Sequence, residues 1–174
     1  MGKDRGTVDH EDEYADFVTG RWPSLVRAAV FLGASPDEAE DLAQTTLVLC
    51  YRKWDRVRAA DDRDAYVFRM LLNTLRSDRR TAWWRKRDLR ELPDQPVGDG
   101  SEAAAIADAV HRAMSTLTAD QRNVVVLRYF VQLTEAQTAA VLGVPAGTVK
   151  SRLSRSIASL SANHHLSEFA GGAR

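Results

Sequence analysis

The chain has 174 residues, and its 24 Lys and Arg residues balance 24 Asp and Glu residues, so the formal net charge is +0. This length suits one ordinary domain or two small ones. A composition with 44% hydrophobic and 28% charged residues is typical of globular proteins and argues against a disordered, collagen-like or membrane-spanning class. No run approaches the roughly 18 consecutive apolar residues that cross a bilayer, and the first residues lack the apolar core of a secretory signal. We therefore expect a cytoplasmic protein with no membrane insertion.

Charge is distributed unevenly along the chain. Residues 76–90 are rich in Arg, and residues 146–160 contain basic but no acidic side chains. Basic stretches of this kind suit a polyanionic partner. Between them, residues 91–105 combine acidic residues with Pro and Gly, which is typical of a flexible linker. The pattern predicts two modules that contact one long anionic partner.

The first predicted helix covers the apolar pattern from Phe17 to Leu32. Pro23 lies inside this pattern, and proline removes a backbone donor and crowds the preceding turn, so the helix is predicted to kink or restart there. The stretch Ser35-Pro36-Asp37-Glu38 combines an N-cap serine, a proline at the first helical position and a glutamate three residues after the cap. A second helix should therefore begin at about Pro36.

Helical signals continue in the second half of the chain. Two more capping boxes lie at Thr118 to Gln121 and at Thr134 to Gln137. The β-branched run Val124–Leu127 follows the first box and continues to Phe130 without turn residues, so we interpret it as a buried helix. A single apolar stripe at helical spacing predicts a helix before these boxes, formed by Ile106, Ala109, Val110, Ala113, Met114 and Leu117. No convincing strand is found, and the predicted fold class is all-α.

The stretch from Leu133 to Leu160 is the most informative part of the sequence. Gly143 can take the positive φ of a tight turn, and Pro145 can start a new helix after it. That second helix has an apolar face opposite a polar and basic one at about 100° per residue, namely Val149, Leu153, Ile157 and Leu160 against Thr148, Ser151, Arg152 and Arg155. The arrangement predicts a helix-turn-helix whose second helix enters the DNA major groove. The alternative is an ordinary helical hairpin with a solvated basic face.

Several strings resemble extracytoplasmic-function (ECF) sigma factors of bacterial RNA polymerase. The promoter-reading C-terminal domain of that family is resembled by LTADQR at 117–122, VVVLRYF at 124–130 and LGVPAGTVKSRL at 142–153. SPDEAEDLAQ at 35–44 resembles the helix that docks on the polymerase clamp, and residues 65–80 resemble the segment that opens and reads the minus-ten element. The resemblance covers about residues 11–162. Trp83 and Trp84, followed by a basic cluster, resemble the actinobacterial SigE-like subgroup.

The resemblance implies two small helical domains, one sigma-2-like and one a helix-turn-helix of the sigma-4 type, joined by a flexible acidic linker. The implied organisation is a flexible N-terminus at 1–10, sigma region 2 at 11–88, the linker at 89–104, sigma region 4 at 105–162 and a flexible tail at 163–174. The implied function is promoter-specific transcription initiation without catalysis. The alternative is a stand-alone helix-turn-helix repressor or activator, and an interaction-only protein such as an anti-sigma decoy is a third interpretation.

The implied partners are core RNA polymerase, through its β′ clamp and β flap, and promoter DNA as duplex and as melted single strand. An anti-sigma factor is a further expected partner. The resemblance assigns polymerase binding to Asp37, Glu40, Asp41, Gln44 and Thr45, where Thr45 replaces a glutamate that is common in the family. Asp41 and Gln44 lie one turn apart and could present a carboxylate and an amide to a basic partner. The alternative for both is a solvated polar face.

Minus-ten binding is assigned to Arg63, Asn73, Arg76, Arg79, Arg80, Trp83 and Trp84. By resemblance, the polar segment 55–64 is a loop that forms part of a pocket for a flipped base. Asn73 could contact a base edge or act as a structural cap, and the two tryptophans could stack on unpaired bases or pack on the core. Minus-thirty-five binding is assigned to Thr148, Lys150, Ser151, Arg152 and Arg155.

No enzymatic or metal site is predicted. The histidines His10, His111, His164 and His165 lack nearby Cys or carboxylate residues at metal-ligand spacing. We therefore expect no metal and no cofactor. Cys50 is the one cysteine of the chain and is interpreted as a small buried apolar residue.

Overall fold

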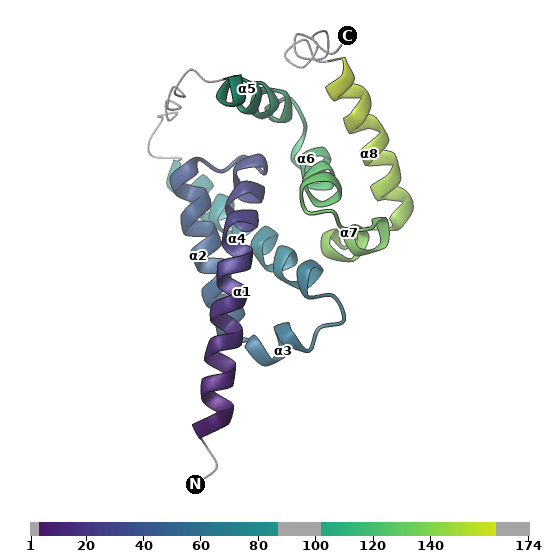
Figure 1. Cartoon of the computed structure of the whole chain (residues 1–174). Helices are drawn as coiled ribbons and strands as arrows, with labels where there is room; N and C mark the ends of the chain where they lie inside the picture. Colours follow the sequence, from purple (N-terminus) through teal and green to yellow (C-terminus); the bar gives the residue numbers. More distant parts are fainter. Residues whose placement is uncertain (1–3, 87–101, 163–174) are drawn as a thin grey trace. The chain divides into compact units, whose positions relative to one another are not determined.

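The structure is a computed structural model that describes residues 4–86 and 102–162, and within them the side chains of 10–80 and 108–162. Every element in these ranges is a helix (Figure 1), which confirms the all-α prediction. Helices α1 to α4 form one compact unit and α5 to α8 a second. The helices are α1 (Asp4–Phe31), α2 (Pro36–Arg52), α3 (Trp54–Arg58), α4 (Arg63–Lys86), α5 (Glu102–Ser115), α6 (Ala119–Val125), the π-helix η1 (Val126–Phe130), α7 (Glu135–Leu142) and α8 (Ala146–Ser161).

Helix α1 is continuous through Pro23, so the prediction of a restart at this proline is wrong. Phe17 is buried on the N-terminal side of Pro23, and Leu25 and Ala29 are buried on its C-terminal side. Burial of one fully apolar side chain contributes about 2 kcal/mol, and several such residues outweigh the roughly 3 kcal/mol cost of proline in a helix. Packing on both sides of Pro23 therefore holds the helix together.

Helix α2 begins as predicted. The Ser35 hydroxyl accepts the Glu38 N–H at 3.3 Å, the Glu38 carboxylate accepts the Ser35 N–H at 2.9 Å, and Pro36 occupies the first helical turn. Gly33 precedes the cap with a φ of 95°, a conformation that glycine adopts without a steric penalty. The inward face of α2 includes Leu42 and Cys50, which pack in the core of this unit.

An aromatic cluster joins α1, α2 and α3. Tyr14 of α1 lies with its ring centroid 4.9 Å from Tyr51 of α2 and 5.2 Å from Trp54 of α3, and Phe17 lies 5.0 Å from Trp54. The Tyr14 hydroxyl donates to the Leu47 carbonyl at 2.8 Å, and burial raises the pKa of this phenol. The hydroxyl therefore remains a donor well above neutral pH.

The segment 55–64 differs from the loop that we predicted. Its first residues belong to α3, and α4 begins at Arg63, so only residues 59–62 connect the two helices. Helix α3 has no side-chain cap, and Trp54 and Val57 anchor it because both are buried. A polar sequence without a capping signal forms a helix here because two side chains pack on the core.

In the second unit, both predicted capping boxes are present. The side chain of Thr118 accepts the Gln121 N–H at 3.3 Å, and that of Thr134 accepts the Gln137 N–H at 3.2 Å. Between them the chain is helical as predicted, and Val124 to Leu127 are buried. The last turn is the π-helix η1, which ends before Gln132 with its left-handed φ of 64°.

Helices α7 and α8 form the helix-turn-helix. Gly143 takes a left-handed φ of 68° and its N–H bonds the Ala139 carbonyl at 2.8 Å. Val149 of α8 is fully buried against Val124 of α6 and Ala139 of α7. This shared core fixes α8 against two other helices, so the segment is more than an isolated hairpin.

Several predicted segments fall partly or wholly outside the described residues. The tail at 163–174 and most of the linker at 89–104 lie outside them, as do the side chains of Trp83, Trp84 and Ile106. Helix α1 begins at Asp4, inside the range predicted as a flexible N-terminus, and α5 begins at Glu102, inside the range predicted as linker.

Replacing glycine by alanine should have opposite effects at two positions near the turn. At Gly143 and Gly147 an added Cβ meets no atom within 4 Å, so backbone conformation alone decides the outcome. Gly143→Ala places alanine at a φ of 68° and should destabilise the protein by about 1 kcal/mol. Gly147→Ala lies inside α8 and should stabilise it by up to about 0.8 kcal/mol. Urea unfolding followed by circular dichroism measures both, and shifts of the same sign would contradict this account.

The thiol of Cys50 should react slowly in the folded protein. Burial raises its pKa to about 11, so at pH 8 about one thiol in a thousand is the reactive thiolate. We expect iodoacetamide to alkylate the native chain at least about a hundred times more slowly than the urea-unfolded chain. The native rate should rise about tenfold per pH unit up to the raised pKa. Mass spectrometry follows the reaction, and equal rates in the two states would refute the assignment.

Candidate functional site

The five residues assigned to polymerase binding lie together on the exposed face of α2. The helical repeat of about 3.6 residues per turn places them opposite the buried stripe that contains Leu42 and Cys50. None of the five is buried, and none belongs to the core of this unit. They are Asp37, Glu40, Asp41, Gln44 and Thr45.

Two apolar residues continue this face toward the end of α2. Val48 is 46% exposed and Tyr51 is 55% exposed, and around the helix both fall within the arc between Glu40 and Asp41. The sequence analysis named neither residue. The signal that could have identified them is their spacing, because Val48 follows Gln44 by four residues and Tyr51 follows Val48 by three.

The predicted minus-ten residues on α4 are only partly on one face. Asn73, Arg76 and Arg80 are exposed on the side of α4 opposite the buried residues Leu71 and Leu75. Arg69 lies on the same side, one turn before Asn73, and was missed because it precedes the basic run. The four side chains line about three turns of helix with one polar, basic strip.

Arg79 lies at the edge of that strip. Desolvation lowers the pKa of its guanidinium, and the Glu38 carboxylate at the start of α2 opposes the shift. Arginine has so high a pKa that the side chain stays charged at neutral pH. Arg79 is therefore a cation that interacts electrostatically with the beginning of α2.

Arg63 lies apart from the other predicted minus-ten residues, at the first turn of α4. Its guanidinium is 5.5 Å from the ring centroid of Trp54 and 3.5 Å from the carboxylate of Glu13 in α1. It also donates to the Arg58 carbonyl at 3.4 Å. Its Nη2 group therefore contacts two other residues of the same unit.

The predicted faces of α8 are confirmed in part. Val149 is buried, and Thr148, Ser151 and Arg155 share the opposite side. Ile157, which we placed on the packing face, is 40% exposed. Ser156 is fully buried in its place, because its hydroxyl donates to the Arg152 carbonyl at 2.7 Å and is thereby satisfied inside the core.

The basic residues of α8 are not equivalent. Arg155 is exposed, and Lys150 lies about 160° around the helix from Arg152. Arg152 pairs with Asp120 of α6 at 2.7 Å and is 25% exposed. This ion pair ties α8 to α6 and neutralises one of the three cations predicted to contact DNA.

An open hollow lies beside α3 in the first unit. It measures about 650 Å³ and is lined from α1, α2 and α3, including His10, Tyr51 and Arg56. Within residues 4–86 and 102–162, no group of three His, Cys, Asp or Glu side chains could hold a metal ion. In those same ranges no helix combines the length and apolarity of a membrane span.

Known proteins match both units. Residues 19–85 match the family described as Sigma-70 region 2, and residues 107–160 match the family described as Sigma-70, region 4. The RNA polymerase sigma-E factor of Streptomyces avermitilis is 41% identical over 153 residues, which cover 85% of this chain and 83% of that protein. The ECF RNA polymerase sigma factor EcfG of Rhodopseudomonas palustris is 30% identical over 159 residues, covering 87% of this chain and 84% of that protein.

A solved structure with the same fold is that of the sigma factor RpoE from Bartonella quintana, in complex with the anti-sigma factor NepR. Its TM-score with this chain is 0.72 at 26% sequence identity, covering 93% of this chain and 99% of that chain. The fold and the two matched regions define an RNA polymerase sigma factor of the Sigma-70 class. The chain belongs to the extracytoplasmic-function family of these factors, as its sequence motifs predicted.

Proposed function

We propose that this sigma factor binds core RNA polymerase through α2 and reads promoter DNA through α4 and α8. The observation that carries the proposal is the separation of faces on these three helices. Each buries one apolar stripe and leaves a polar or basic face in water. It acts as a specificity factor rather than as an enzyme, and it does so in the cytoplasm, where RNA polymerase meets the chromosome.

The exposed face of α2 is the proposed docking surface for the β′ clamp. Asp41 and Gln44 supply a carboxylate and an amide, and the exposed Val48 adds an apolar contact. Desolvated apolar centres with polar rims carry most of the free energy in protein interfaces. Thr45 contributes no charge, so the neighbouring acids carry the electrostatic attraction.

The strip on α4 is the proposed surface for the melted minus-ten strand. Arg76, Arg79 and Arg80 follow phosphates, and Asn73 contacts a base edge. Arg69 extends the basic track by one turn. The connection 59–62 and the helix ends beside it form part of the pocket for a flipped base, while Trp83 and Trp84 stack on unpaired bases.

In the second unit, α8 is the proposed recognition helix for the minus-thirty-five element. Thr148, Ser151 and Arg155 face outward together, and Lys150 contacts phosphate at one flank. With so few cations, non-specific binding by this helix alone has a dissociation constant of about 10⁻⁴ to 10⁻⁶ M. Linking two weak modules on one large partner raises the effective concentration of the second contact to about the millimolar range. Promoter binding therefore depends on core polymerase and its β flap.

An anti-sigma factor is a proposed further partner. The structural neighbour from Bartonella quintana was solved in complex with the anti-sigma factor NepR. The exposed apolar residues Val48 and Tyr51 on α2, and Tyr129 and Phe130 on η1, offer contact area in both units. A protein that covered the face of α2 would compete with polymerase for this sigma factor.

Reversing the charge of Asp41 should weaken polymerase binding. Asp41→Arg replaces an exposed carboxylate and should reduce affinity for core polymerase by at least about tenfold, the scale of one interfacial charge pair. Co-elution with core polymerase on a sizing column, with primary sigma as competitor, measures the effect. Arg155→Ala is the control and should co-elute normally. If the wild-type chain formed no complex at micromolar concentration and bound duplex DNA alone, the stand-alone regulator would replace this proposal.

Removing Arg155 should weaken binding to minus-thirty-five DNA and spare polymerase binding. Loss of one phosphate-contacting cation lowers the slope of log affinity against log salt by about 1. The measurement is binding of reconstituted holoenzyme to fluorescent promoter DNA between low and moderate salt. Asp41→Arg, tested at saturating polymerase, should keep the wild-type slope. An unchanged slope for Arg155→Ala would exclude this residue from the DNA contact.

A further inference from the structure

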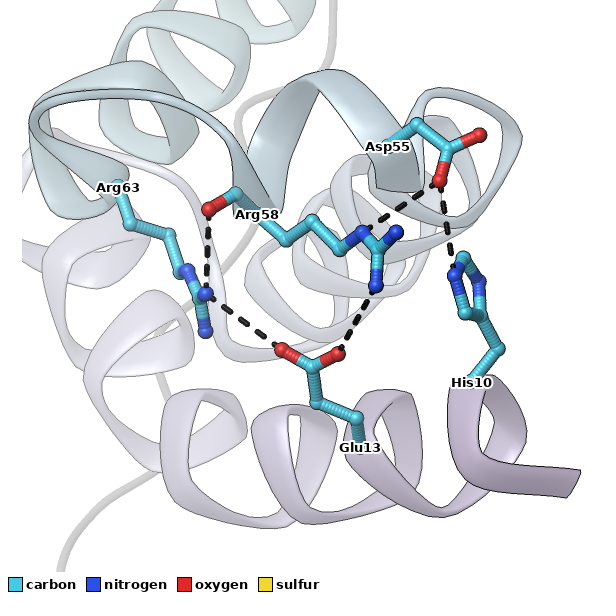
Figure 2. Close-up of polar contacts among 5 residues, drawn as sticks. All are labelled: His10, Glu13, Asp55, Arg58 and Arg63. Carbon is cyan, nitrogen blue, oxygen red and sulfur yellow. Dashed lines mark hydrogen bonds and ion pairs between the residues drawn. The ribbon is translucent and has the colours of Figure 1, made fainter. Parts of the chain in front are cut away.

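A cluster of charged residues connects the first helix with the α3–α4 connection. Figure 2 shows Glu13 of α1 between Arg58 at the end of α3 and Arg63 at the start of α4. One carboxylate oxygen of Glu13 lies 3.7 Å from the Arg58 guanidinium, and the other lies 3.5 Å from that of Arg63. Residues 59–62, which connect the two helices, are thus flanked by two arginines, and Glu13 of α1 contacts both of them.

The two arginines are also held to each other. Arg63 donates to the main-chain carbonyl of Arg58 at 3.4 Å, which spans the connection directly, and its guanidinium lies 5.5 Å from the Trp54 ring centroid. Within the connection, the Asp62 carboxylate accepts the Ala65 N–H at 2.9 Å and caps the first turn of α4. These contacts give the connection a closed, defined shape.

Of the two acids drawn in Figure 2, Glu13 is the one that contacts both arginines. Asp55 is 3.5 Å from the Arg58 guanidinium and 3.6 Å from His10, so Arg58 has a second acidic partner within α3. The acidic partner of Arg63 in Figure 2 is Glu13. Without the Glu13 charge, Arg58 can turn to Asp55, whereas Arg63 is left beside another cation.

The cluster contributes more to shape than to folding. Side chains of Glu13, Arg58 and Arg63 are between 37% and 42% exposed, and ion pairs this open to solvent add little to stability. Folding of this region rests instead on the buried Trp54 and Val57. Neutralising Glu13 should therefore loosen the connection while the unit stays folded.

We propose that Glu13 is a positioning residue for minus-ten recognition: by pairing with Arg58 and Arg63 it fixes the connection 59–62 and so sharpens the choice of base there. This inference rests on the proposed function, in which the connection borders a flipped base. It also gives Arg63 a different task from the direct DNA contact predicted from the sequence. Arg63 acts on DNA through the connection that it closes.

The test compares Glu13→Gln with Asp12→Asn in reconstituted holoenzyme. Both substitutions remove one negative charge from α1 and keep the side-chain size, but Asp12 is exposed and lies outside the cluster in Figure 2. Each variant transcribes a DNA library whose minus-ten region is randomised, and transcripts are sequenced. The readout is the ratio of the most to the least preferred base at every position, measured beside affinity for core polymerase.

We expect Glu13→Gln to reduce that ratio at least threefold at one or two positions, with polymerase affinity within twofold of the wild type. Asp12→Asn should keep the wild-type ratios. Wild-type ratios for Glu13→Gln, or equal losses in both variants, would overturn the positioning role and leave the proposed function intact. A wild-type chain that binds polymerase but shows no base preference at minus ten would overturn both.

A second pair of variants keeps the inference testable if Glu13→Gln fails to fold by circular dichroism. Arg63→Gln removes the same ion pair from the other side and should reduce the base-preference ratio at the same minus-ten positions. Arg63→Lys keeps a cation beside Glu13 and should retain at least half of the base preference that Arg63→Gln loses. Wild-type base preference for Arg63→Gln, or a loss in Arg63→Lys as large as that in Arg63→Gln, would contradict the proposal.

Discussion

Burial of one apolar stripe per helix constrains almost everything else in this protein. In α2 the inward positions of Leu42 and Cys50 leave Asp41 in water, and in α8 the burial of Val149 leaves Arg155 in water. The core face and the exposed face therefore lie on opposite sides of the same helix. A substitution that rotates a helix in its core also redirects the side chains that we propose contact polymerase or DNA.

The features that sequence alone predicted are local ones. The capping boxes that start α2, α6 and α7 involve side chains and N–H groups three residues apart, so the chain carries its own signal for them. The left-handed turn at Gly143 is equally local. The family was predictable for a related reason, since its motifs are short strings of consecutive residues in both units.

The features that sequence reasoning missed depend on contacts between distant segments. Continuity of α1 through Pro23 and the existence of α3 each follow from packing with other helices, and the buried Ser156 hydroxyl also lies 3.4 Å from the Gln121 carbonyl of α6. The candidate site shows the same division. The acidic face of α2 was predictable, whereas the role that we propose for Glu13 could be inferred only from the contacts of Glu13 with Arg58 and Arg63.

The ion pair between Asp120 and Arg152 also bears on how this protein searches a chromosome. A guanidinium that already faces a carboxylate releases fewer counterions from DNA, which lowers affinity for arbitrary sequence. A genome offers about a million or more competing sites, and each brief stay on one of them delays assembly with polymerase. By shortening the residence time on non-specific DNA, the ion pair within the second unit keeps more of the sigma factor unbound and ready to assemble with polymerase.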